Sequence, residues 1–97
     1  MNLTLHDAAR LEIREAAEYY ANESRKLAVD FRWELNRALE IVVNGPLRFE
    51  QIRPGVRRLL LERFPYGIYY RMPDDMTIRI IAVKHHSRRP GLGMRRP

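Results

Sequence analysis

Two adjacent histidines near the end of the sequence, His85 and His86, are the side chains best suited to acid–base chemistry. An unperturbed imidazole titrates at about pH 6.5, so either histidine could transfer a proton under neutral conditions. A shared metal ion is disfavoured, because neighbouring residues on a strand point to opposite faces. We therefore expect no metal and no other cofactor, with one histidine closing the edge of the core and the other facing solvent or a partner.

Arginine dominates the second half of the chain. Residues 1–45 carry six basic and eight acidic side chains, a net charge of −2, whereas residues 46–97 carry twelve and four, a net charge of +8. Eleven of those twelve basic residues are Arg, which suits a bidentate grip on carboxylates and phosphates. Because such a concentration of like charge opposes folding, it predicts an acidic partner, either nucleic acid or protein.

The strongest candidates for a shared binding surface are five of these arginines. Arg57, Arg58 and Arg63 fall on one predicted strand, and Arg88 and Arg89 follow another. For any single arginine, an ordinary solvated position is the alternative. Their clustering favours a docking surface.

The length and composition indicate one small domain. A chain of 97 residues builds one core from two layers of secondary structure, so we expect a single domain over residues 1–97. The sequence has no cysteine, which fits a reducing compartment, and no apolar run that could span a bilayer. We expect a cytoplasmic protein that does not enter membranes.

Helical periodicity covers most of the first half. A short strand at residues 3–5 precedes a helix that opens near Asp7, the predicted N-cap, and reaches about Asn22. A second helix starts after Ser24 and ends at the sequence Asn-Gly-Pro of residues 44–46, where Gly can adopt the left-handed conformation and Pro cannot continue a helix. Trp33 lies one position off its apolar stripe, so it either fills the boundary between helix and sheet or anchors a protein contact.

The second half changes to the pattern of a sheet. Branched and aromatic residues over 56–64, 66–72 and 77–85 predict three strands, of which the last two form an antiparallel hairpin. The predicted fold class is α+β, with a helix hairpin packed on a mainly antiparallel sheet of three to four strands. The basic tail, residues 87–97, has too few apolar residues to pack by itself, and we expect it to be mobile when unpartnered.

This order of elements resembles the RelE/ParE toxin superfamily over nearly the whole chain. The segments that carry the resemblance are EAAEYY at 15–20, RRLLL at 57–61, FPYGIYY at 64–70 and AVKH at 82–85. The resemblance implies the toxin of a bacterial type II toxin–antitoxin system, held inactive by a cognate acidic antitoxin in a hetero-oligomer. Members of the superfamily either cut mRNA on the ribosome, as the RelE type does, or block DNA gyrase, as the ParE type does.

Three positions depart from the ribonuclease pattern that the resemblance supplies. Leu60 and Gly67 stand where a ribonuclease has basic residues, and Leu92 falls on or near the position of a tail tyrosine. The sequence is therefore closer to the ParE type, which acts on DNA gyrase by protein contact, and we expect no enzymatic activity. The target-binding or antitoxin-binding residues are then the five arginines named above and Trp33.

Two other functions stay open at this point. A ribosome-dependent mRNA endonuclease would use Arg58, His85 or His86, and Arg88 as an irregular catalytic set. A non-toxic module would keep the fold and the antitoxin contact without activity. In every case, a disordered acidic and apolar segment of the antitoxin could lie on the helix hairpin or add a strand to the sheet edge.

Overall fold

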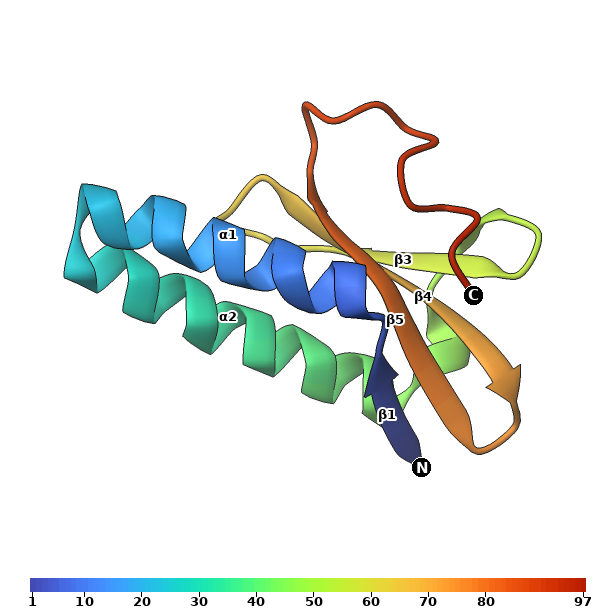
Figure 1. Cartoon of the computed structure of the whole chain (residues 1–97). Coiled ribbons are helices and arrows are strands. Elements are labelled where there is room, and N and C mark those ends of the chain that lie inside the picture. Colours follow the sequence, from blue (N-terminus) through green and yellow to red (C-terminus); the bar gives the residue numbers. More distant parts are fainter.

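The computed structural model describes residues 1–97 and has two helices on one face of a five-stranded sheet (Figure 1). The chain runs through β1 (Asn2–Leu5), α1 (Asp7–Glu23), α2 (Arg25–Asn44), a 3-10 turn (Pro46–Arg48), β2 (Gln51–Arg53), β3 (Val56–Leu60), β4 (Tyr66–Asp74) and β5 (Thr77–His85). The α+β class, the helix hairpin and the N-terminal strand are confirmed. Neither helix is long and apolar enough to cross a membrane.

The helix boundaries follow local capping chemistry. The Ser24 hydroxyl accepts a hydrogen bond from the Leu27 amide at 3.0 Å, which confirms this N-cap. For α1 the cap is His6, one residue before the predicted Asp7, and its Nδ1 accepts from the Ala8 amide at 3.0 Å. The helix α2 ends at Asn44, within the expected Asn-Gly-Pro sequence. Its C-cap Gly45 has φ −167° and is not left-handed, so the stop reflects the restriction that Pro46 imposes on the preceding residue.

The sheet has five strands in the order β1-β5-β4-β3-β2. The pair β1 and β5 is parallel, and the other pairs are antiparallel. The prediction of three to four strands missed β2, which has only three residues and is joined to β3 through Gly55 at φ +77°. The predicted first sheet strand also ends earlier, at Leu60, because the segment after it turns toward α2.

A bulge in β5 decides which residues face the helices. Tyr69 pairs with Ala82 and Tyr70 with Ile80, so Ile81 is an extra residue on β5. Before the bulge Ile80 points to the helices; after it, Val83 does. Ile81 and Ala82 both belong to a separate cluster on the opposite face of the sheet. The uninterrupted apolar run in this strand therefore reflects a sheet that is covered on both sides.

The face under the helices holds the main core, a cluster of 16 buried residues. Its aromatic part joins both helices to the sheet: the Tyr20 and Phe64 rings lie 4.9 Å apart, and the Phe31 and Tyr66 rings 5.4 Å apart, both nearly edge to face. We call this side of the sheet the helix face.

The opposite side, the tail face, is covered by residues 87–97. Met94 is 1 % exposed and packs with Val56, Tyr69, Ile81 and Ala82. The Arg71 guanidinium donates to the Met94 carbonyl at 2.7 Å and to the Arg96 carbonyl at 3.0 Å. Backbone carbonyls and one apolar side chain supply docking contacts that the composition of the segment does not reveal, and the mobility of the unpartnered tail stays a prediction.

Candidate interaction site

The predicted arginine cluster divides between the two faces of the sheet. Arg58 is exposed and lies opposite Tyr69 on the tail face. Its neighbour Arg57 points to the other side, where it donates to the Phe49 carbonyl at 2.6 Å. Alternation along β3 therefore separates two residues that are adjacent in the sequence. Arg58 is available to a partner, whereas Arg57 stabilises the chain after the 3-10 turn.

Arg63 lies beyond β3 and is bound to α2. Its Nε donates to Glu34 Oε1 at 2.9 Å, while the amides of Glu62 and Arg63 donate to Glu34 Oε2 at 2.8 and 3.0 Å. Burial by itself raises the pKa of Glu34, but these hydrogen bonds outweigh it and lower the pKa below its usual value. Arg63 thus orders a loop and does not share the surface of Arg58.

Trp33 lies beside this ion pair and not beside the tail face. It is 63 % exposed and lines a groove of about 380 Å³ between α2 and the end of β3, with Leu60 and Ile41 among the other lining residues. An exposed Trp at an apolar groove is typical of a protein contact. Of the two interpretations made from the sequence, the structure favours the surface position.

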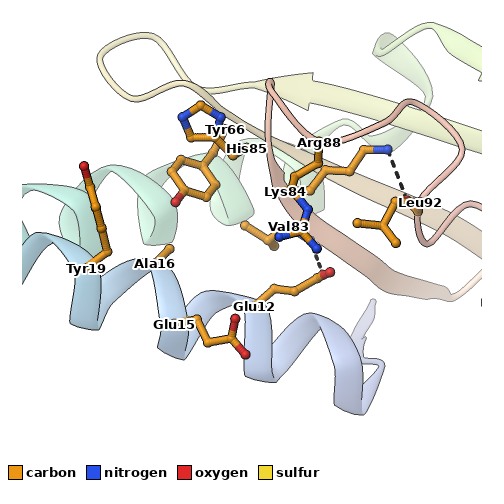
Figure 2. A pocket seen from close by; sticks show the side chains of 10 residues that line it. All are labelled: Glu12, Glu15, Ala16, Tyr19, Tyr66, Val83, Lys84, His85, Arg88 and Leu92. Carbon is orange, nitrogen blue, oxygen red and sulfur yellow. Dashed lines mark hydrogen bonds between the residues drawn. The ribbon is translucent and has the colours of Figure 1, made fainter.

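His85 and Arg88 line a cleft of about 240 Å³ between α1 and the end of β5 (Figure 2). The His85 ring meets Tyr66 edge to face at 5.2 Å, and its Nδ1 accepts from the Ser87 amide at 2.9 Å. Glu15 and Tyr19 of α1 face them across the cleft. Burial raises the pKa of Tyr66, Tyr19 adds to this effect, and Arg88 opposes it.

The sheet separates the residues of the alternative catalytic set. His85 pairs with Tyr66 on the helix face, whereas Arg58 is on the tail face. His86 is exposed beyond the end of β5, where its amide donates to the Pro65 carbonyl at 2.8 Å. General acid–base catalysis needs its groups within hydrogen-bonding reach of one reacting centre. Arg58 and His85 do not meet that condition in this structure.

Gly67, a position where the ribonuclease pattern requires Arg, is tightly enclosed. A Cβ built there would lie 3.0 Å from a Tyr69 ring carbon and 3.2 Å from Leu60 Cδ2. Gly67 is buried and pairs with Leu60 on β3. A larger residue would force the aromatic ring aside, so this departure from the ribonuclease pattern is built into the packing of the sheet.

Sequence reasoning missed the role of Lys84, which is 5 % exposed on the tail face. Its ammonium donates to three carbonyls of the tail, those of Arg89 at 3.2 Å, Pro90 at 2.7 Å and Leu92 at 3.1 Å. Burial lowers the pKa of Lys84, Arg53 adds to this effect, and Glu12 opposes it. The signal in the sequence was a lone Lys inside an apolar strand, which predicts a buried cation that needs acceptors.

Comparisons with known proteins agree with this architecture. The family model described as the ParE toxin of the type II toxin–antitoxin system parDE matches residues 3–90. Among solved structures, the chromosomal ParDE toxin–antitoxin system from P. aeruginosa contains a chain with the same fold, with a TM-score of 0.75 at 19 % identity. The match covers 88 % of this chain and 95 % of that one. None of the curated proteins matches the sequence.

The family match begins at the second residue of β1, spans the whole helix hairpin and the other four strands, and ends inside the tail. The chain therefore belongs to the ParE toxin family of type II toxin–antitoxin systems.

Proposed function

We propose that this ParE-type toxin inhibits DNA gyrase by protein–protein contact through its tail face and is neutralised by a cognate acidic antitoxin. The observation that carries the proposal is Arg58, an exposed cation on the tail face with no carboxylate partner. The chain forms three ion pairs in all, made by Lys26, Arg63 and Arg96. The remaining arginines keep a positive field that attracts acidic surfaces.

The separation of Arg58 from His85 supports contact and not catalysis. A phosphodiester held at Arg58 would have the thickness of the sheet between it and the His85 imidazole. A surface that binds a protein needs no such convergence, because exposed arginines can act as separate contacts.

A supercoiling assay with purified bacterial DNA gyrase tests the target. We expect inhibition at toxin concentrations on the order of micromolar or below, as for a typical specific complex. Arg58→Glu should raise the concentration for half-inhibition about tenfold or more, because it reverses a charge at the contact. Arg25→Glu is the matched control: it makes the same change in net charge at an exposed position of α2. Unchanged supercoiling at micromolar parent toxin would refute the gyrase target.

Neutralisation by an antitoxin follows from the same charge. An acidic, apolar segment would order on binding while its carboxylates replace the counterions of the arginines. Co-expression with the product of a neighbouring reading frame that encodes a short acidic protein should restore growth to cells that produce the toxin. If growth stays arrested although both proteins accumulate, that frame does not encode the antitoxin.

A further inference from the structure

Lys84 is the only charged side chain in the buried set of residues, and the tail satisfies it completely. An ammonium group has three donors, and the three carbonyls of Arg89, Pro90 and Leu92 accept all of them at 2.7–3.2 Å. The Tyr69 ring lies beneath the nitrogen, 4.8 Å from its centroid, in a cation–π contact. The ammonium is therefore enclosed by three carbonyls of the tail loop and by the Tyr69 ring.

No carboxylate shares this site, which makes the tail carbonyls indispensable to Lys84. Glu12, the acidic residue that acts on it, is committed to Arg96 at 2.9 Å and to the Val83 amide at 3.1 Å. Burying a charged amine is costly unless its donors are bound. The docked tail removes water from the ammonium and replaces it with its own carbonyls, so the loop can close over Lys84 only along the path that brings these three acceptors to the nitrogen.

The loop that Lys84 binds has no sheet or helix ladder of its own. Its internal backbone bonds are single turns, from the Leu92 amide to the Arg89 carbonyl at 3.1 Å and from the Met94 amide to the Gly91 carbonyl at 3.2 Å. Gly93 is in the left-handed region at φ +80°. An isolated segment with so few bonds samples many conformations. The ammonium is therefore the element that brings three carbonyls of this loop to one point.

The position of the loop has a direct effect on the exposed surface. Figure 2 shows Lys84 reaching toward Leu92 while Arg88 and Leu92 form one wall of the cleft. Arg88 and Arg89 are both exposed, and neither side chain makes an ion pair. Where these two guanidinium groups point thus depends on the path of the backbone around Lys84.

We propose that Lys84 is a positioning residue, whose ammonium holds the tail on the sheet and thereby presents Arg88 and Arg89 to the target. The second half of this statement rests on the proposed function, and the first half does not. A neutral side chain of similar size at position 84 should release the loop, whereas the core under the helices should stay folded.

The first test compares Lys84→Met with Lys26→Met. The control removes an ammonium that is 85 % exposed and paired only with Asp30. Tail docking is measured by trypsin cleavage after Arg88 and by the methyl resonance of Met94, which packs against Tyr69 in the docked state. We expect Lys84→Met to accelerate the cleavage about tenfold or more and to shift the Met94 signal toward its value in an unfolded chain. Lys26→Met should change neither.

A chemical rescue separates the charge from the packing. Because the chain has no cysteine, Lys84→Cys carries a unique thiol. Alkylation of the unfolded variant with 2-bromoethylamine, followed by refolding, places an ammonium at nearly the original distance from the backbone. Alkylation with iodoacetamide gives a neutral side chain. Tail protection should return only with the aminoethyl form. Equal protection in the two forms, or unchanged protection in Lys84→Met, would overturn the positioning role.

The gyrase assay with the same proteins tests presentation to the target. Lys84→Met should weaken inhibition about tenfold, and the aminoethyl form of Lys84→Cys should recover it. A loosened tail with undiminished inhibition would refute the presentation of Arg88 and Arg89 to the target, but not the role of Lys84 in holding the tail. If the parent toxin does not inhibit gyrase, the proposed function fails, and the cleavage and resonance measurements still decide whether Lys84 holds the tail.

Discussion

The two faces of the sheet are covered by different kinds of interaction. The helix face buries a cluster of 16 residues from both helices, the two longest strands β4 and β5, and the loop between β3 and β4. The tail face buries an apolar cluster of only five residues. Its other contacts are made by cations: Lys84, Arg71 and Arg79 donate to backbone oxygens of the tail, and Arg96 of the tail donates to the Ile81 carbonyl and to Glu12. Apolar packing is insensitive to partners, whereas cations held by neutral carbonyls would bind carboxylates more strongly.

This difference assigns separate roles to the two faces. The helix face supplies the free energy that keeps the chain folded, since apolar burial contributes in proportion to the area removed from water. The tail face supplies charge and shape for recognition, and its cover can open without exposing the main core. Substitutions on the helix face should therefore mainly lower the free energy of unfolding, whereas substitutions on the tail face should mainly change tail docking and recognition.

The largest effect is expected for Ile80→Ala on the helix face. Ile80 is fully buried, so the substitution should lower the free energy of unfolding by about 2–5 kcal/mol. Urea unfolding measures this as a lower midpoint at an unchanged slope. Leu47→Ala, at a position that is 69 % exposed, should stay within about 0.5 kcal/mol of the parent protein. A loss of similar size in both variants would contradict the assignment of stability to this face.

A smaller effect is expected for Met94→Ala on the tail face, although Met94 is as well buried as Ile80. Because the tail can leave the sheet while the core stays folded, the substitution costs no more than the free energy of undocking. Global stability should fall by about 1 kcal/mol or less, while amide exchange at Leu92 and Met94 accelerates. A loss equal to that of Ile80→Ala would mean that the two faces unfold as one unit.

The smallest effect on stability is expected at Glu34, whose carboxylate on α2 binds the loop after β3. Its folded pKa lies below the usual value of 4.5, so its contribution is present at higher pH and is lost as pH falls through the folded pKa. Arg63 is half exposed, which limits this contribution to about 1 kcal/mol or less.

Urea midpoints between about pH 6 and pH 3 test this expectation. The parent protein should lose stability on acidification more steeply than Glu34→Gln, whose amide does not titrate. Identical slopes in the two proteins would show that the Glu34 hydrogen bonds do not persist in solution.

The helices and the long strands were predictable because their signals are local. Ser24 is a helix cap by virtue of its hydroxyl, Pro46 ends the helix before it, and β4 and β5 are joined by turn residues. The strand β2 was not predictable, since its three residues have no periodicity of their own and pair only because Gly55 turns the chain back onto β3.

The candidate site was predictable in composition but not in arrangement. The excess of arginine indicated a binding surface, and Arg58 is indeed exposed on the tail face. The structure does not place Arg57 and Arg63 beside Arg58. Arg57 points to the helix face, and Arg63 is bound to Glu34 of α2. Whether any of these arginines binds a target stays a prediction.

The sequence by itself determined the element order, the division into a slightly acidic half and a strongly basic half, and the resemblance to the toxin superfamily. Only the tertiary structure decided which side of the sheet each cation occupies and what covers the tail face. The bulge at Ile81 changes the side on which the following residues of β5 lie, and it exists only through pairing with β4. The acceptors for Lys84 are backbone carbonyls, which every residue carries and no sequence pattern reveals.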